Sequence, residues 1–211
     1  MAHLEPVLDQ IIDQLSQEEE LIAEARLPTI NKLTQYIHNK QQSSKKVRLN
    51  FICTHNSRRS QIAQIWAHTA AVAYQIPHVE TYSGGTEATA FNNWAVRAMN
   101  TLGFRIEARQ DTGEDQNPAY EVRIGTGLPS LTCYSKKFDE ILSPDTPLAA
   151  VMTCSDADQN CPLVPGAELR IPLTFDDPKQ FDGSGREQKE YLKTALQIGR
   201  EIIYAFRQVS I

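Results

Sequence analysis

The chain has 211 residues and a mass of 23.7 kDa, which fits one domain with an appendage or two small domains. Its formal net charge of -5 and its pI of about 5.6 argue against a nucleic-acid binder. No apolar run approaches the roughly 20 residues that cross a bilayer, so we expect no membrane association. The first residues lack the basic patch and apolar stretch of a signal peptide, so we expect a cytoplasmic protein. In that compartment, four cysteines favour catalytic, redox or metal-binding roles over structural disulfides.

Residues 1–46 are predicted to form a helical arm that ends in a linker. Apolar residues recur at helical spacing from residue 4 to about 41, and Pro28 separates two helices or kinks one. The polar run that follows has the composition of a linker. No catalytic pattern occurs in this arm, so we expect it to serve in packing or as the surface of a homodimer.

From residue 47 onward, predicted strands alternate with predicted helices. The strands are expected near 47–52, 78–82 and 149–153, and the helices near 59–75, 95–102 and 186–208. This order predicts a catalytic domain at 47–211, built on an open, mostly parallel sheet with helices on both faces. The alternation weakens between about 108 and 146, where segments 120–124 and 131–134 are expected to form an inserted β-hairpin.

The segment from Cys53 to Ser60, CTHNSRRS, carries the strongest chemical signal. A cysteine ends a predicted strand, five residues intervene, and Arg59 begins a predicted helix. The N–H groups of such a loop and of the first helical turn converge on one point, where the helix dipole favours an anion. The same field favours the thiolate of Cys53, and Arg59 offers a planar fork for two oxygens of a tetrahedral anion. A buried strand-end cysteine beside a basic helix cap is the alternative.

An oxyanion held in this loop would contact the six residues that follow the cysteine. These expected oxyanion-binding residues are Thr54, His55, Asn56, Ser57, Arg58 and Arg59.

Two further cysteines flank the polar segment 154–162, CSDADQNCP. Cys154 and Cys161 are seven positions apart, which does not match the closer spacing of zinc-ligand pairs, so no metal site is expected there. The polar residues between them favour an exposed, flexible loop over two buried thiols, and such a loop suits thiol–disulfide exchange. Cys53 and Cys154 both follow predicted strands, so we expect them to face one crevice at the carboxyl edge of the sheet.

Asp177, in the segment FDDP at 175–178, is a candidate acid. A thiolate that displaces an oxygen needs an acid to protonate the leaving group, and the following proline keeps Asp177 in extended backbone. An ordinary turn is the alternative, and the assignment as an acid depends on the presence of Cys53 and Arg59.

Together, these three segments resemble the thioredoxin-coupled arsenate reductases, a family built on the low-molecular-weight tyrosine phosphatase fold. The resemblance covers about residues 47–210, without the insertion. The spacing of Cys53 and Arg59 is common to reductases and phosphatases of this fold, whereas CSDADQNCP resembles the redox loop of the reductases. Phosphatases of this fold typically have aromatic residues directly after the Asp-Pro pair, where this chain has Lys179 and Gln180.

The resemblance implies that Cys53 attacks arsenate while Arg59 and the loop amides hold its oxygens. Ser60 would hydrogen-bond the Cys53 thiolate, and Asp177 would protonate the departing hydroxide. No bound cofactor is implied for these steps.

The resemblance also implies a disulfide relay that yields arsenite. Cys154 would attack the adduct at Cys53 and form a Cys53–Cys154 disulfide. Cys161 would then attack Cys154, and a thioredoxin would reduce the resulting 154–161 pair.

Some positions depart from the family pattern. Asn56 and Ser83 match positions that bind a potassium ion in some members, but Gln64 stands where a glutamate ligand is expected. Arg58 replaces a smaller residue and adds positive charge near the anion.

Two more residues have no counterpart in that pattern. His55 replaces a glycine, and we favour a residue on the solvent-facing rim over one that tunes Cys53. Cys133 is interpreted as a structural thiol of the hairpin.

Two other functions remain open from the sequence. A phosphomonoesterase, or a protein tyrosine phosphatase, would use Cys53, Arg59 and Asp177 without Cys154 and Cys161. A redox-sensing or anion-binding module would turn over neither substrate.

Overall fold

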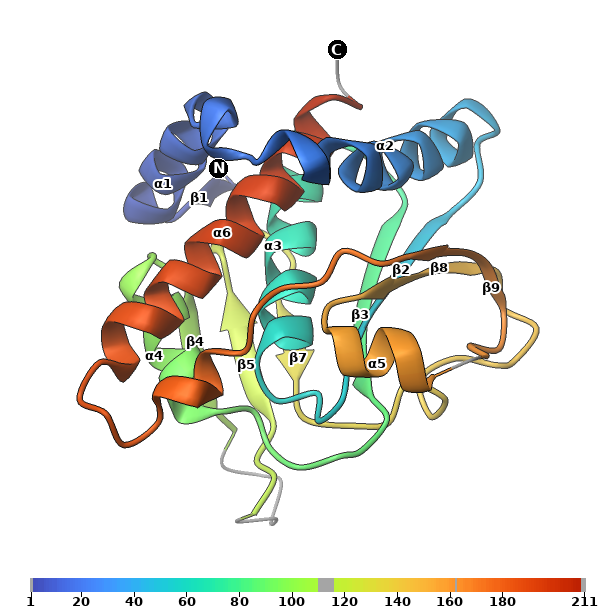
Figure 1. Cartoon of the computed structure of the whole chain (residues 1–211). Coiled ribbons are helices and arrows are strands. Elements are labelled where there is room, and N and C mark those ends of the chain that lie inside the picture. Colours follow the sequence, from blue (N-terminus) through green and yellow to red (C-terminus); the bar gives the residue numbers. More distant parts are fainter. Residues whose placement is uncertain (1, 110–115, 162, 210–211) are drawn as a thin grey trace.

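The computed structural model describes residues 2–109, 116–161 and 163–209, and Figure 1 shows how they are arranged. At its centre lies a sheet of four parallel strands in the order β3-β2-β8-β9. The strands are β2 (Val47–Cys53), β3 (Val79–Gly85), β8 (Leu148–Met152) and β9 (Ala167–Ile171). The open parallel sheet predicted from the sequence is therefore confirmed, and β9 is a strand that the sequence analysis did not identify.

One face of this sheet carries the main hydrophobic core. Leu49 and Phe51 of β2 pack there with Val151 of β8, and all three are fully buried. The helices of this layer are α2 (Leu27–Gln42), α3 (Arg59–Ala73) and α6 (Glu187–Arg207). Helix α6 lies against α3 (Figure 1), where the indole N–H of Trp66 donates to the carbonyl oxygen of Ala195 at 2.9 Å.

The other face of the sheet carries a smaller core. Ile52 of β2 and Met152 of β8 point to this side, where they pack with Ala157 of helix α5 (Ser155–Asn160) and with Phe138. Side chains of a strand alternate between faces, so a strand buried on both sides is apolar throughout, as β8 is. Helices cover both faces as predicted, with one short helix and the chain around Phe138 on this side.

The N-terminal residues form two α-helices, as the position of Pro28 predicted. They are α1 (Pro6–Gln17) and α2, and two short 3-10 helices, Glu19–Leu21 and Glu24–Arg26, join them. Pro28 is the second residue of α2, where a backbone N–H has no partner within the helix to lose. The linker that follows leads directly into β2.

These N-terminal helices lie against the rest of the chain. Their buried apolar residues are Leu8, Ile12, Leu15, Ile30, Leu33 and Ile37. Arg26 pairs with Glu201 of α6 at 2.5 Å, and Arg200 of α6 pairs with Glu18 at 2.6 Å. The strand β1 (His3–Leu4) pairs with β6 (Gly125–Thr126). The apolar face of the arm is therefore covered by its own chain.

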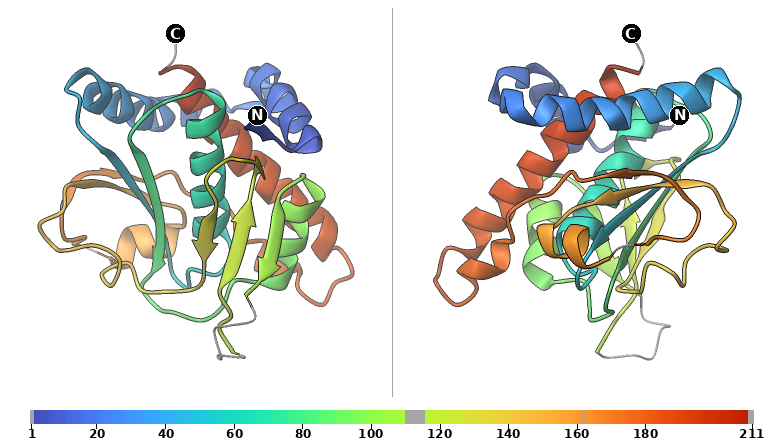
Figure 2. Two further views of the ribbon diagram at one scale, coloured as in Figure 1. Left: turned by 180° about the vertical axis from the view of Figure 1, so that it is seen from behind. Right: turned by 45° about the vertical axis from the view of Figure 1, so that its right-hand side comes forward.

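The region of the predicted insertion forms a second, antiparallel sheet beside α3 and α4 (Asn93–Thr101), seen from behind in the left view of Figure 2. The expected hairpin is present as β5 (Tyr120–Arg123) and β7 (Leu131–Cys133). A third strand, β4 (Arg105–Ala108), pairs with β5 and was not predicted. Part of the predicted insertion, 110–115, lies outside the described residues.

No helix in the described ranges is both long and apolar enough to span a membrane.

Candidate active site

The loop that joins β2 to α3 turns its backbone carbonyls outward. The carbonyl of Cys53 accepts from Thr86 N at 3.2 Å, and that of Ser57 accepts from Asn92 N at 2.9 Å. The carbonyls of Thr54, His55 and Asn56 also accept hydrogen bonds from outside the loop. In a trans peptide, each carbonyl is opposite to the next N–H. The N–H groups of residues 54–58 therefore point toward the interior of the loop, where they suit an anion.

Asn56 holds the curvature of this loop. Its φ of +46° lies in the left-handed region, which asparagine tolerates better than most residues. The Asn56 Oδ1 atom accepts from Lys136 N at 3.0 Å and from Gln61 Nε2 at 3.2 Å. The end of β3 also approaches closely, since a β-carbon on Gly85 would lie 2.7 Å from Asn56 N. A glycine is needed at position 85 for this contact.

Cys53 lies at the carboxyl end of β2 and at the amino end of α3. Its Sγ is 3.1 Å from Ser60 Oγ, and Asn56 Nδ2 donates to the same Oγ at 2.8 Å. Because Ser60 Oγ accepts from Asn56, its own hydrogen is free to point at the sulfur. Cys53 is 3% exposed, so this hydrogen bond is protected from water.

Arg59 and Asp177 lie together beside this loop. The Arg59 guanidinium donates from Nη2 to Asp177 Oδ2 at 2.6 Å and from Nη1 to the carbonyl of Phe175 at 2.8 Å. Within the described part of the chain, the buried Nε of Arg59 has no hydrogen-bond partner. A bound oxyanion would satisfy that donor.

Arg58 also contacts Asp177, through its Nε and Asp177 Oδ1 at 3.0 Å. The side chain of Arg58 is 9% exposed. We expected it to add positive charge near the anion, and in the structure that charge is paired with the Asp177 carboxylate. Asp177 also accepts from Lys179 N at 3.0 Å, at the start of the 3-10 helix Pro178–Phe181.

Cys154 follows β8, the strand beside β2, and lies against the same loop. Its Sγ is 3.5 Å from Thr54 Oγ1, the side chain next to Cys53. The same sulfur accepts from Ala157 N at 3.3 Å and so caps the start of α5. The structure therefore places both cysteines at the same edge of the sheet.

The expectation of a flexible loop between Cys154 and Cys161 was wrong, although four of the six residues between them are exposed. This segment forms helix α5, and the two cysteines are 1% and 4% exposed. The Cys154 sulfur accepts a hydrogen bond from a backbone N–H at the start of the helix, and the Arg170 guanidinium donates to a backbone carbonyl at its end. Ala157 packs inward against the smaller core. Burial raises the pKa of Cys161, and the nearby guanidinium of Arg170 opposes that shift.

The structure also shows where the residues expected for a potassium ion lie. Ser83 Oγ donates to Gln61 Oε1 at 3.4 Å, and Gln64 Nε2 donates to the carbonyl of Thr81 at 3.0 Å. The Gln61 Nε2 group already donates to both the carbonyl and Oδ1 of Asn56. The Asn56 oxygens thus already accept from an amide, whereas the buried Gln64 Oε1 has no hydrogen-bond partner, and no carboxylate among the described residues joins this cluster.

Several residues that build the loop were missed from the sequence. Ser135 Oγ donates to the carbonyl of His55 at 2.9 Å, and Asn117 exchanges two hydrogen bonds with the backbone of Ser135. These residues come from the region that looked like an insertion, and nothing in their local sequence indicates a contact with position 55. Gln61 is the exception, because its position on the first turn of α3 indicates that its side chain can contact the loop.

His55 and Cys133 lie at the margin of the site or outside it. The His55 side chain is 36% exposed, and its Nε2 is 3.7 Å from Glu87 Oε2. Cys133 is fully buried in β7, and burial raises its pKa to about 12. These positions suit a rim residue and an unreactive structural thiol, respectively.

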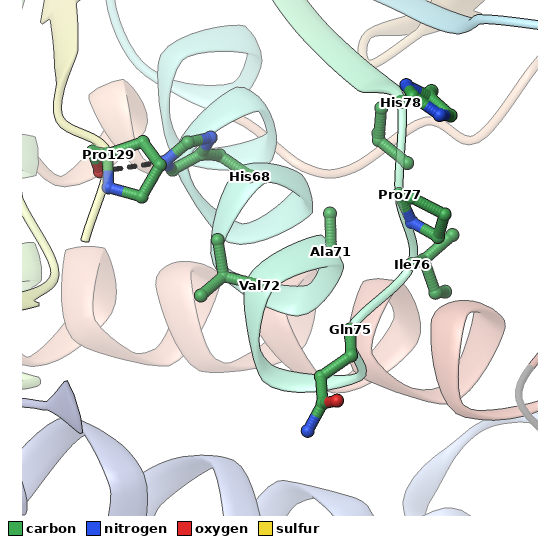
Figure 3. A pocket seen from close by; sticks show the side chains of 9 residues that line it. His68, Ala71, Val72, Gln75, Ile76, Pro77, His78 and Pro129 are labelled. Carbon is green, nitrogen blue, oxygen red and sulfur yellow. Dashed lines mark hydrogen bonds between the residues drawn. The ribbon is translucent and has the colours of Figure 1, made fainter. Parts of the chain in front are cut away.

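A surface pocket of about 420 Å³ lies elsewhere on the molecule (Figure 3). Its lining comes mainly from the end of α3 and the segment that joins α3 to β3, including His68, Ile76 and His78. Cys53 lies at the opposite end of β2, so this pocket and the cysteine loop are at opposite edges of the sheet. His68 Nε2 lies 3.1 Å from the carbonyl oxygen of Pro129, and no nucleophile lines the pocket.

Comparisons with known proteins find arsenate reductases among the curated relatives of the chain. Arsenate reductase 2 of Staphylococcus epidermidis is 29% identical over 153 residues, which cover 72% of this chain and 95% of the relative. Arsenate reductase 2 of Staphylococcus haemolyticus is 30% identical over 153 residues, with the same coverage. A solved structure of an arsenate reductase in the phosphate binding state is 16% identical with a TM-score of 0.46, and covers 77% of this chain and 98% of that chain. No family model matches the chain.

Proposed function

The chain belongs to the arsenate reductase family, and we propose that it reduces arsenate to arsenite through Cys53, Cys154 and Cys161. The single observation that carries this proposal is the position of the Cys154 sulfur, 3.5 Å from the hydroxyl of Thr54, directly beside the nucleophile loop. A hydrolase of phosphate esters has no use for a second thiol at that place.

In the first step, the thiolate of Cys53 attacks arsenic. An S–As bond forms, and one arsenate oxygen leaves as water after it receives a proton from Asp177. The inward N–H groups of the loop and the Arg59 Nε, which lacks a partner among the described residues, support the assignment of the oxyanion to this loop. Arsenate takes over donors of Arg59 that now face Asp177.

In the second step, the thiolate of Cys154 attacks the sulfur of Cys53. An S–S bond forms and the S–As bond breaks, and its electron pair stays on arsenic. Arsenic is thereby reduced from As(V) to As(III) and leaves as arsenite. Cys161 then attacks Cys154, which forms the Cys154–Cys161 disulfide and returns Cys53 as a thiolate.

An external dithiol must reduce that last disulfide, and we propose a thioredoxin for this role and the cytoplasm as the compartment. Leu163, two positions after Cys161, is 76% exposed and offers an apolar contact for such a partner. A homodimer remains a prediction, and it would need a surface other than the apolar face of the N-terminal helices. No step is assigned to potassium, because Gln61 already donates to the oxygens of Asn56.

Phosphomonoester hydrolysis is a second candidate activity of the same loop. The observation that favours it is the contact of Asp177 with Arg59, which puts a carboxyl group beside the anion site. Phosphate and arsenate are both tetrahedral oxyanions, so Cys53, Arg59 and Asp177 suffice for slow cleavage of an aryl phosphate.

The test is arsenite production with thioredoxin, thioredoxin reductase and NADPH, run beside aryl-phosphate hydrolysis. Cys161→Ser should stop arsenite production after the first turnover and leave hydrolysis of the aryl phosphate unchanged. Cys133→Ser is the matched control, since Cys133 is buried in another sheet. Undiminished multiple turnover in Cys161→Ser, or no arsenite from the wild-type chain, would overturn the proposal.

A further inference from the structure

The carboxyl end of helix α5 is held by one side chain, Arg170 of β9. Arg170 Nη1 donates to the carbonyl of Cys161 at 2.6 Å, and Nη2 donates to the carbonyls of Ala157 and Asp158. Its Nε also donates to Asp158 Oδ1 at 3.0 Å. The last carbonyls of a helix have no partner inside it, so this guanidinium supplies what the helix itself lacks.

The contacts of Arg170 matter because α5 separates the two thiols that the relay must join. Cys154 caps the start of α5, and Cys161 caps its end. Seven positions along an α-helix span about 10 Å, whereas a disulfide requires Cα atoms within about 7 Å of each other. The Cys154–Cys161 disulfide therefore cannot form while α5 is wound.

We propose that Arg170 is a positioning residue that latches α5 in the dithiol state and so opposes formation of the Cys154–Cys161 disulfide. Unwinding of α5 separates the carbonyls of Ala157, Asp158 and Cys161 from one another, and a single guanidinium cannot follow all three. In the latched state Cys161 stays buried, and Cys154 stays beside Thr54 in the loop that follows Cys53. Release of the latch accompanies transfer of the disulfide, and its reduction lets α5 and the latch re-form.

Arg170 contacts the carbonyls of α5 and the side chain of Asp158, and its guanidinium also lies near the Cys161 thiol, where it opposes the rise in that thiol's pKa. It projects from β9, whose pairing with β8 puts it opposite Ala150. Its position on an ordered strand gives the latch a fixed base while the helix winds and unwinds. This inference rests on the proposed function only for the role that it gives to the Cys154–Cys161 disulfide. The contacts by which Arg170 stabilises α5 are present without arsenate.

The test is the redox equilibrium of the Cys154–Cys161 pair in the full chain, with Cys53→Ser and Cys133→Ser to remove the other thiols. Two thiols and one oxidised glutathione give one disulfide and two reduced glutathiones. The disulfide fraction is measured by acid quench, alkylation and mass spectrometry over a series of glutathione buffers. We expect Arg170→Ala to raise the equilibrium constant for the disulfide about tenfold, since several hydrogen bonds of the dithiol state are lost.

Two further variants separate the fork of Arg170 from its charge. Arg170→Lys keeps a positive charge but cannot reach three carbonyls at once, so it should also raise the equilibrium constant. Asp158→Asn removes one charged partner and keeps the carbonyls, so it should shift the constant in the same direction by less. Arg97→Ala, at an exposed arginine of α4 that stacks on Trp94, is the matched control and should leave the constant unchanged.

Hydrogen exchange supplies a second readout of the latch. In the reduced protein, the amides of Asp158 and Cys161 donate within α5, and Arg170→Ala should speed their exchange while α4 keeps its protection. An equilibrium constant within twofold of the parent, a lower constant, or unchanged exchange in α5 would each overturn the inference. These measurements use no arsenate, so loss of the proposed reductase activity would not change their outcome.

Discussion

Removal of the Ser60 hydroxyl is predicted to slow the first chemical step by about 10- to 100-fold. The hydroxyl lies 3.1 Å from Cys53 Sγ, and the bond from Asn56 Nδ2 leaves its hydrogen for the sulfur. A hydrogen bond to a charged group contributes about 1.5–3 kcal/mol, and each ~1.4 kcal/mol is a factor of ten in rate. Both partners are buried, so water does not replace the lost donor.

The assay for Ser60→Ala is a single turnover with excess arsenate and no reductant, in which arsenite is measured against time. Ser57→Ala is the matched control, because the Ser57 hydroxyl donates away from the sulfur, to the carbonyl of Ala90 at 2.6 Å. Its backbone N–H stays in place, so we expect a much smaller loss. A rate for Ser60→Ala within twofold of the wild type, or equal losses in the two variants, would refute the role given to Ser60.

Three further predictions concern the loop, the N-terminal helices and the pH dependence of stability. Gly85→Ala should abolish arsenite production while circular dichroism stays native, because its β-carbon would lie 2.7 Å from backbone atoms of the loop. Arg26→Ala should lower the free energy of unfolding in urea by about 3 kcal/mol, because Glu201 is left buried without its partner. Arg105→Ala, at an exposed pair, should cost at most about 0.5 kcal/mol, and equal losses would contradict this account. Burial lowers the pKa of His68 below its ordinary value of 6.5, so the unfolded chain binds more protons and stability falls as the pH drops below 6.5. His68→Gln should flatten that slope in pH-dependent unfolding, and an unchanged slope would count against it.

The central sheet and the order of its helices could be predicted because period-2 and period-3.6 patterns are local. The roles of Cys53 and Arg59 could be predicted for the same reason, since their chemistry follows from a strand, a loop and a helix in succession. The short strands β4 and β9 carry charged residues at several positions and give no clear alternation. Their pairing depends on neighbouring strands, which a single segment of sequence does not reveal.

Helix α5 was missed because its sequence is polar and its stability comes from elsewhere. The segment SDADQN has little apolar surface, and a helix of six residues is not stable in isolation. It forms here because Cys154 caps one end and Arg170, nine positions beyond Cys161, holds the other. The contacts of Ser135 and Asn117 with the loop were likewise long-range and had no local signature.

The most direct test of the relay is one turnover of the wild-type chain with arsenate in the absence of any reductant. We expect one arsenite per chain, with Cys154 and Cys161 joined in a disulfide and Cys53 recovered as a free thiol. In Cys161→Ser, the same experiment should give one arsenite and a trapped Cys53–Cys154 disulfide. Arsenite released with no disulfide at Cys154, or a wild-type disulfide that excludes Cys161, would contradict the account.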